Sequence, residues 1–556
     1  MGNKRGCKME HQKEKADFLF TGGQVVTVNG DNDIVGAVAV AKDRILYVGC
    51  EEEAKAYIGS ETRVIDIGGK TLTPGFIDTH IHVCHTGAIQ TLIIDVDPSK
   101  AGSIETIKDM IRDAAAAKPE GSWISCWGYD EERLLEKRHP TKEDLDEAAP
   151  NHLVQLCRYC GHAGVFNSKA LAAGGIGAGM PGRFPAGQVV VENGEPSGLL
   201  HETAYYHMWQ FVEFPEEELV LALKAENERL VRAGVTMAHD AGSYGAKANR
   251  AICRAVAEGA LQVRIVPMMF SLLGKEKVKE DIHSYINTGV GGLFGNARLK
   301  FGLMKIMLDG SSSGPTCFVR EPYCHKDDVG LMDWDQDELN EMALAIHRAG
   351  LQATAHAVGD RAIEMWLDAV ENAQRVCPRE DARHRIEHCA ICPPDLVKRI
   401  RDLKMIPGPN SAFIGMFGER YARFYGDRVR DLFPCKSFLD AGIPSCIATD
   451  CSIAPENPMV GLYAAVTRIA GGGSAGGGGG TVIGGNQRIG LMDAIRMYTY
   501  NPAYACFSEN ELGSIEKGKL ADLTLWSGEI MNGAPEKLLE SECLMTMIGG
   551  RIAYEK

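Results

Sequence analysis

The middle of the chain alternates short apolar runs with longer amphipathic segments, and this alternation limits the folds open to it. It indicates strands connected by helices, and therefore parallel βαβ units. Repetition over roughly 400 residues favours an α/β fold, a (β/α)8 TIM-like barrel with insertions. We expect helices at 216–233, 336–348 and 362–373, and strands at 234–239, 303–308, 352–355 and 445–448.

A doubly wound sheet is the alternative, but no G-x-G-x-x-G follows a strand, so a dinucleotide site is not indicated. The glycine run Gly471–Gly480 lacks the Gly-Lys-Ser/Thr that a phosphate-binding loop requires. We expect this run to be a flexible loop beyond the strand that ends at Asp450, where it could act as a mobile lid at the barrel mouth.

Both ends of the chain are rich in short β-type runs broken by Gly, Asn and Asp. We therefore predict a small β-sandwich domain built from residues 16–74 and 505–556. The barrel is expected at 75–504 with a large insertion at about 121–207, and residues 1–15 are expected to be a disordered leader.

Composition narrows the classes of function. The chain has 59 basic and 74 acidic residues and a net charge of −15, which argues against general affinity for nucleic acid or anionic membrane. Its 17 cysteines are mostly scattered, some within apolar runs as at Cys446, and this suits reduced thiols in a cytoplasmic protein. The N-terminus lacks the apolar core of a signal peptide. We expect a cytoplasmic protein whose partner is a small-molecule substrate.

Two histidines end an apolar run in Thr73-Pro-Gly-Phe-Ile-Asp-Thr-His-Ile-His82. Because side chains alternate faces along a strand, His80 and His82 point the same way and can bind one metal ion. Two histidines on an exposed strand face would give the same spacing, so the pair alone does not decide.

Lys305 lies inside the apolar run Leu303-Met-Lys-Ile-Met-Leu-Asp-Gly310. Burial of this amine would lower its pKa, and the neutral amine could react with carbon dioxide to form a carbamate that bridges two metals. The alternative is a lysine that reaches the surface from a partly buried strand.

Three further candidates stand at the ends of expected strands. His356 ends Leu351-Gln-Ala-Thr-Ala-His, Asp450 ends Gly442-Ile-Pro-Ser-Cys-Ile-Ala-Thr-Asp, and His388 ends His384-Arg-Ile-Glu-His. His384 and His388 would share a strand face, and we favour His388 because it is last. Hydrogen-bonded structural histidines and a helix-capping aspartate are the alternative interpretations. His162 and Glu202 fall in the insertion or its return, and we interpret them as substrate contacts or supporting groups, with a purely structural role as the alternative.

The order of these motifs resembles the amidohydrolase superfamily, and most closely its family 3 branch of enzymes similar to N-substituted formamide deformylase. Further matching stretches are Trp127-Gly-Tyr-Asp-Glu, Gly161-His-Ala-Gly-Val-Phe-Asn-Ser-Lys-Ala-Leu and Gly513-Ser-Ile-Glu-Lys-Gly-Lys-Leu-Ala-Asp-Leu. The resemblance covers about residues 17 to 554, and an ordered set of motifs is far more specific than any one of them.

The resemblance implies a barrel with a β domain from both termini, and a centre of one or two Zn²⁺ or other divalent ions. It implies that His80, His82 and Asp450 bind the first metal, that carboxylated Lys305 bridges, and that His356 and His388 bind the second. Family habit also suggests a homodimer. The expected substrate-binding set is His162, Glu202, Cys126, Tyr129 and Asp309; Cys126 replaces a small residue and would narrow the pocket or add a soft ligand.

The implied reaction is metal-dependent hydrolysis of an amide or cyclic amide by metal-activated hydroxide, with Asp450 as proton shuttle. The alternative on the same fold is a metal-dependent decarboxylase, lyase or isomerase. A non-enzymatic binding protein on a retired barrel is disfavoured, because all six candidate ligands are present.

Overall fold

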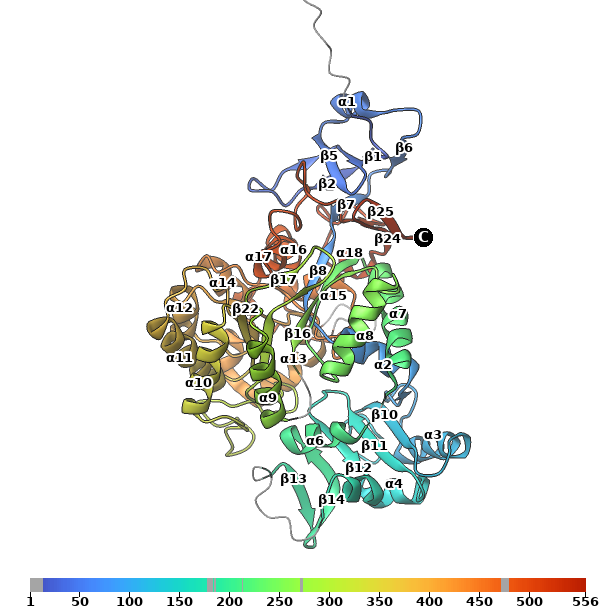
Figure 1. The fold of residues 1–556 in the computed structure, drawn as a ribbon, viewed down its shortest axis with the longest axis vertical. Coiled ribbons are helices and arrows are strands. Elements are labelled where there is room, and N and C mark those ends of the chain that lie inside the picture. The colour runs from blue at the N-terminus through green and yellow to red at the C-terminus, as the bar shows by residue number, and fades with distance from the viewer. Residues whose placement is uncertain (1–13, 178–183, 185–186, 213, 271–273, 472–479) are drawn as a thin grey trace, which may run out of the picture.

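The computed structural model describes residues 14–177, 184, 187–212, 214–270, 274–471 and 480–556. The predicted leader lies almost wholly outside these residues, and so does most of the Gly471–Gly480 run. Three parts follow one another along the long axis of the molecule: terminal strands at one end, a central sheet with its helices, and an inserted sheet at the other end (Figure 1).

The central part is a mixed α/β fold around a nearly closed parallel sheet of seven strands, which we call the barrel. The strands follow one another in chain order around the sheet, as expected for successive βαβ units. They are β8 (Phe76–Ile81), β15 (Val235–Asp240), β16 (Arg264–Met269), β19 (Leu303–Met307), β20 (Gln352–Ala357), β21 (Arg385–His388) and β22 (Ile406–Gly408).

The prediction of a strand at 445–448 is wrong, because this segment does not form a regular strand. It nevertheless occupies the gap between β22 and β8: Cys446 N donates to Pro407 O at 2.9 Å, and Asp450 N donates to His80 O at 2.7 Å. Pro407 and Pro409 supply carbonyls but no N–H groups, so the ladder on this side is incomplete. The segment thus closes the ring with few hydrogen bonds.

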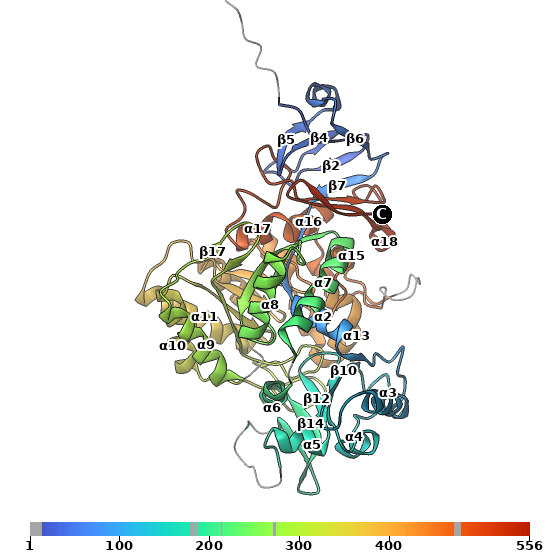
Figure 2. The ribbon, with the colours of Figure 1, turned by 45° about the vertical axis from the view of Figure 1, so that its right-hand side comes forward.

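Helices lie outside the barrel strands, and Figure 2 shows several of them from a second direction. Asp335 and Glu338 form a reciprocal capping box that fixes the start of helix α10 at Gln336. The predicted start of this helix is confirmed. The barrel helices are α2 (Val83–Thr91), α7 (Glu216–Arg232), α8 (Ala246–Ala257), α9 (Lys275–Asn287), α10 (Gln336–Arg348), α11 (Asp360–Val376), α12 (Pro394–Asp402), α13 (Ala412–Tyr425), α14 (Cys435–Asp440), α15 (Pro458–Thr467), α16 (Leu491–Tyr498) and α17 (Tyr500–Ala505).

The insertion between α2 and α7 forms its own six-stranded sheet in the order β13-β14-β12-β11-β10-β9. Its strands begin earlier in the chain than residue 121, at β9. The elements are β9 (Ile94–Asp95), α3 (Ile104–Ala117), β10 (Trp123–Tyr129), α4 (Lys142–Ala148), β11 (Leu153–Arg158), β12 (Ala163–Phe166), α5 (Ser168–Ala173), β13 (Val189–Glu192), β14 (Glu195–His201) and α6 (Glu202–Met208).

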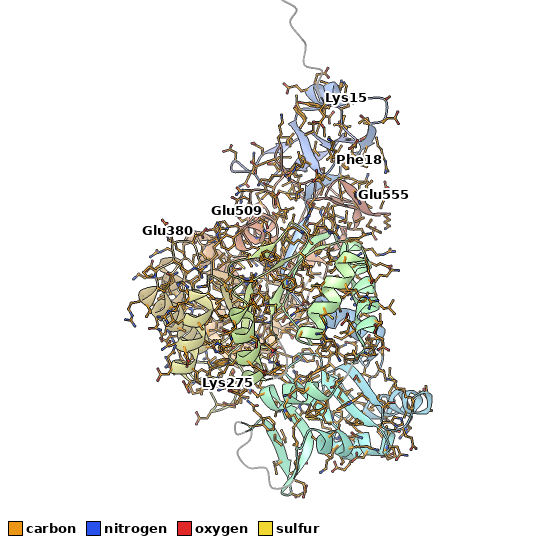
Figure 3. The ribbon with its side chains drawn as sticks, viewed as in Figure 1. Lys15, Phe18, Lys275, Glu380, Glu509 and Glu555 are labelled. Atoms are coloured by element: carbon orange, nitrogen blue, oxygen red, sulfur yellow. The ribbon has the colours of Figure 1, made fainter. Side chains whose placement is uncertain are left out.

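Strands from both chain ends share a second six-stranded sheet, β25-β24-β23-β7-β2-β3, beside a four-stranded sheet β5-β4-β1-β6. Phe18 and Glu555, near opposite ends of the chain, lie close together at this end of the molecule (Figure 3), where Arg63 pairs with Glu555. The strands are β1 (Phe18–Thr21), β2 (Gln24–Val26), β3 (Ile34–Val35), β4 (Ala37–Ala41), β5 (Arg44–Gly49), β6 (Arg63–Asp66), β7 (Thr71–Pro74), β23 (Leu523–Trp526), β24 (Cys543–Ile548) and β25 (Arg551–Glu555).

The parallel barrel strands run from the side of the terminal strands toward the insertion, because β8 continues β7 into the barrel (Figures 1 and 2). Their carboxyl ends therefore face the inserted sheet, and active sites of such barrels lie at that face. Among the described residues, no helix is both long enough and apolar enough to cross a bilayer.

Candidate metal centre

The six predicted ligands meet at the carboxyl ends of the barrel strands and line one cavity. The imidazole rings of His80 and His82 have centroids 5.5 Å apart, and the ring of His388 lies 4.6 Å from His80 and 4.4 Å from His356. Potential ligand atoms of His80, His388 and Asp450 lie within 4.8 Å of one another. Apart from the partly exposed His82, these side chains are buried, so neighbouring residues must satisfy their polar atoms.

His80 is held by a buried carboxylate that the sequence reading did not single out. Its Nδ1 lies 2.5 Å from Glu387 Oε2, and Glu387 also accepts from Thr354 Oγ1 and from Arg385. Since the carboxylate can only accept, Nδ1 carries the hydrogen and Nε2 keeps its lone pair. Such a carboxylate behind a histidine is typical of metal sites.

The three other histidines follow the same rule: an oxygen outside the cluster holds one ring nitrogen and leaves the other for the centre. The contacts are His82 Nδ1 with Gly242 O at 2.7 Å, His388 Nδ1 with Asn410 Oδ1 at 2.7 Å, and His356 Nε2 with Gly310 O at 3.2 Å. Four imidazoles, each with one ring nitrogen held by an oxygen outside the cluster, thus face one space.

Lys305 extends from β19 into the same space, where it is 1% exposed. Its Nζ lies 3.3 Å from His80 Nε2. Burial lowers the pKa of Lys305 to about 8, although the nearby carboxylates of Glu387 and Asp450 act in the opposite direction. A minority of the amine is therefore neutral at pH 7, far more than for an ordinary lysine, and carbamate formation requires this neutral form.

Asp450, at the end of the segment that closes the barrel, faces His80 and His82. Its Oδ1 lies 3.3 Å from His82 Nε2 and 3.6 Å from His80 Nε2. Burial alone would raise the pKa of Asp450, but the hydrogen bond with His82 and the neighbouring imidazoles outweigh it and hold that pKa below its usual range. The carboxylate is therefore an anion at the centre of the cluster.

The residues present fit a divalent cation. Neutral imidazole nitrogens and a carboxylate oxygen are the donor types that zinc and similar ions prefer. A buried carboxylate anion among imidazole nitrogens is an arrangement that a cation would stabilise.

Three residues near the site have left-handed backbone conformations that side chains other than glycine rarely adopt. The φ angles are 46° at Glu202, 68° at His388 and 56° at Asp450. Such strain collects at functional sites and persists only where the surrounding structure enforces it. It aims these side chains in directions that a regular strand or helix end would not allow.

His162 and Glu202 reach the cluster from the insertion. His162 Nδ1 donates to Glu202 Oε2 at 2.7 Å, and the His162 ring lies 5.2 Å from that of His356. Burial would lower the pKa of His162, but the Glu202 carboxylate outweighs it and raises that pKa. Glu202 is oriented in turn by Thr316, whose Oγ1 donates to it at 2.7 Å. The pair stands opposite the barrel ligands.

Asp309 lies behind the cluster, where it organises a turn. Its carboxylate accepts backbone N–H groups of Phe318, Val358 and Gly359 at 2.8–3.0 Å. Burial raises the pKa of Asp309 to about 7 despite these hydrogen bonds. Its oxygens are thus used by the loop that follows His356, and its contact with substrate stays a prediction.

The structure does not bring Cys126 or Tyr129 to the cluster. Both side chains are buried in the apolar core of the inserted sheet, and the Tyr129 hydroxyl contacts His139 Nδ1 at 3.0 Å. Strand alternation separates Cys126 from Trp127, which faces the cavity instead, and a register shift between Trp127 and Tyr129 turns Tyr129 to the core side. His384 is also elsewhere, since it bonds His347 at 2.8 Å.

Several functional candidates escaped the sequence reading. Glu387 lies between His384 and His388 in the sequence, and Asn410 follows β22 outside any recognised motif. His85 lies three residues after His82 and lines the cavity with Trp127 and Trp209. The spacing of His85 from His82, about one helical turn, could have indicated its position near the site. Glu387 and Asn410 could not be found this way, because their positions depend on which strands become neighbours.

Comparison with known proteins places these residues in context. A sequence model of the amidohydrolase family matches residues 63–554. N-substituted formamide deformylase from Arthrobacter pascens is 29% identical over 562 residues, covering 97% of this chain and 98% of that protein. An uncharacterized metal-dependent hydrolase from Pyrococcus horikoshii OT3 has a TM-score of 0.73 at 22% identity, covering 97% and 100% of the two chains.

A more distant likeness joins the chain to atrazine chlorohydrolase from Arthrobacter aurescens TC1, whose structure is complexed with zinc. The TM-score is 0.52 at 12% identity, with 97% of this chain and 95% of that chain covered. At these identities the solved structures show a common fold.

Proposed function

The chain belongs to the amidohydrolase family and is a metal-dependent hydrolase of carbon–nitrogen bonds other than peptide bonds, and we propose that it cleaves an amide or cyclic amide of a small molecule. The observation that carries this proposal is the cluster of four oriented histidines beside Asp450 in one cavity. The relative from Arthrobacter pascens, a formamide deformylase by name, supports the choice of an amide.

We propose zinc as the ion, held by His80, His82 and Asp450, with a second ion between His356, His388 and carboxylated Lys305. The donor set supports this, as does the zinc in the structure of the atrazine chlorohydrolase. A bound divalent metal would polarise the carbonyl and lower the pKa of a water from about 15.7 toward 7. The position of Lys305 beside His80 supports a bridging role for its carbamate.

Within the proposed reaction, Asp450 takes a proton from the attacking water and delivers it to the departing nitrogen. Its lowered pKa keeps it an acceptor at neutral pH, and its place between two histidines keeps it close to the reacting atoms. His162, held by Glu202, would donate a hydrogen bond to the carbonyl oxygen of the substrate.

The direct test combines metal analysis with isotopic labelling. Purified protein is assayed for bound metal, reconstituted with Zn²⁺, and supplied with a panel of N-acyl and cyclic amides in ¹⁸O-water. We expect stoichiometric metal and one ¹⁸O atom in the carboxylic acid product. Turnover that leaves the product unlabelled would instead indicate a lyase or isomerase, and absence of stoichiometric metal would overturn the proposal.

The carbamate has a separate test. Protein reconstituted with Zn²⁺ in bicarbonate is compared with protein reconstituted after removal of carbon dioxide, and both are compared with Lys305→Ala. We expect two ions per chain only with bicarbonate and native Lys305. Equal metal content in all three samples would remove the bridging role.

A further inference from the structure

Two chambers of opposite character meet at the candidate metal centre. The inner chamber contains the ligands and has a volume of about 60 Å³. The outer chamber lies beside it and has a volume of about 440 Å³. Cys160 and His162 line both, so the chambers adjoin where the insertion contacts the barrel. The two chambers therefore offer different surroundings to the two substituents of an amide that reaches the ligands.

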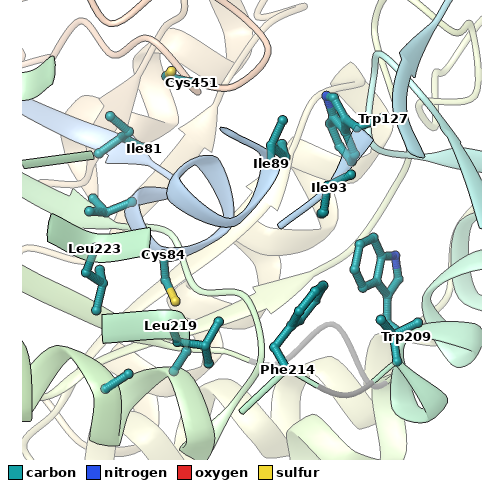
Figure 4. Packing of buried hydrophobic residues seen from close by; sticks show 14 of the residues in the cluster. Ile81, Cys84, Ile89, Ile93, Trp127, Trp209, Phe214, Leu219, Leu223 and Cys451 are labelled. Carbon is teal, nitrogen blue, oxygen red and sulfur yellow. The ribbon is translucent and has the colours of Figure 1, made fainter. Parts of the chain in front are cut away.

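The walls of the inner chamber are apolar and mostly aromatic. Besides the ligands and His162, the described lining residues include no Asp, Glu, Lys or Arg. Trp127 comes from β10, Trp209 follows α6, and both indoles are buried on the insertion side of α2 (Figure 4). The chamber also includes Met307, at the end of β19, and Ile453, just beyond Asp450.

His85 joins the two indoles without adding charge. Its ring lies 4.8 Å from Trp127 and 5.4 Å from Trp209, both edge to face. Its Nδ1 bonds the Tyr244 hydroxyl at 2.7 Å, and burial together with nearby His82 lowers the pKa of His85 to about 3. A charged substituent against these rings would lose its water without gaining an opposite charge.

The outer chamber is polar. Arg158 forms a two-pronged ion pair with Glu131 at 2.7 and 2.8 Å, and Arg423 pairs with Glu132 at 2.9 Å. The loop after Asp309 adds the hydroxyl groups of Ser311, Ser313 and Thr316. Three histidines also line this chamber: His139, His201 and His325. Side chains of both charges and many hydrogen-bonding groups surround this space.

From this contrast we infer that the substrate is an amphiphilic amide, with a compact uncharged apolar group on one side of the scissile bond and a polar group on the other. This inference rests on the proposed function. The inner chamber accepts the apolar group because contact with Trp127, Trp209 and Ile453 removes its surface from water. The outer chamber accepts the polar group because its hydrogen bonds with water can be replaced there.

The test uses two series of synthetic amides with zinc-reconstituted enzyme. In one, the amine is ethanolamine and the acyl group is formyl, propionyl, hexanoyl or succinyl. In the other, the acyl group is glycoloyl and the amine is methylamine, propylamine, hexylamine or β-alanine. We expect kcat/KM in one series to peak at three carbons and to fall at least tenfold for the six-carbon and carboxylate-bearing members.

A variant that fills the inner chamber links this preference to its walls. Ile453→Phe should lower kcat/KM at least tenfold for the favoured three-carbon compound and less than threefold for the one-carbon compound of the same series. Leu135→Phe is the matched control, because Leu135 is 78% exposed on the insertion surface. It should leave both values unchanged.

The outcomes separate the two proposals. If no amide in either series is hydrolysed by metal-loaded enzyme, the proposed amide hydrolysis fails. If amides are hydrolysed but all eight values of kcat/KM lie within threefold, or the carboxylate-bearing members are best, the amphiphilic inference is wrong. The wild-type series decides this even if Ile453→Phe does not fold.

Discussion

At the residue scale, the site depends on groups that never touch substrate. Glu387 sets the tautomer of His80 through a 2.5 Å contact, and is itself fixed by Thr354 and Arg385. We expect Glu387→Gln to weaken zinc binding roughly 10–100-fold, because the amide orients the imidazole less firmly. Competition with a chromophoric chelator measures this, and exposed Glu61→Gln is the control. Unchanged affinity in Glu387→Gln would contradict the role.

Asp450 presents the opposite case, a residue at the reacting atoms. We expect Asp450→Asn to lower kcat roughly 10²–10⁴-fold, because an amide cannot carry the proton from water to nitrogen. Metal content must be measured in the same sample so that loss of the ion is not mistaken for loss of the shuttle. Asp440→Asn, on the surface of α14, serves as the control. A variant with full metal and full activity would refute the assignment.

At the element scale, the helix that supports the histidine-bearing turn contains a buried acid. Glu226 of α7 is fully buried against α2, where Gln90 donates to it at 2.9 Å. Burial raises the pKa of Glu226 to about 8, with Glu456 adding to the effect and Arg229 opposing it. The protonated form is thus favoured by folding. The stability it contributes is complete below the unfolded pKa near 4.5 and is lost as pH rises through 8.

We therefore expect Glu226→Gln to raise the free energy of unfolding by on the order of 2–4 kcal/mol above pH 8, and to have little effect below pH 4.5. Gln keeps the hydrogen bond with Gln90 and does not ionise. Denaturant titrations across this pH range measure the difference. Glu228→Gln, exposed on the same helix, should show no such pH dependence. A gain independent of pH would show that Glu226 is ionised in the folded protein.

At the scale of the whole molecule, one buried ion pair joins the barrel to the terminal strands. Arg264, at the start of β16, donates two hydrogen bonds of 2.7 and 2.8 Å to Asp522, just before β23. Each side chain is 5% exposed. Arg264→Leu leaves a buried carboxylate without its partner, so we expect a loss of about 3–5 kcal/mol in the free energy of unfolding.

The double variant Arg264→Leu/Asp522→Asn should recover part of this loss, since no unpaired charge remains. The exposed pair Arg254–Glu258 offers a control, and Arg254→Leu should cost less than about 1 kcal/mol. Thermal and chemical denaturation measure all three variants. Equal effects of Arg264→Leu and Arg254→Leu would mean that the buried pair does not hold the two parts together.

The sequence by itself determined the strand–helix alternation and the six candidate ligands, because periodicity and residue type at strand ends are local properties. His80, His82, Lys305, His356, His388 and Asp450 do converge. Local pattern could not show that Glu387 lies behind His80, that Trp127 rather than Cys126 faces the cavity, or that residues 445–450 close the barrel without a regular strand. These three features follow from the folded structure alone. Each depends on which distant segments become neighbours and on which face of a strand meets them.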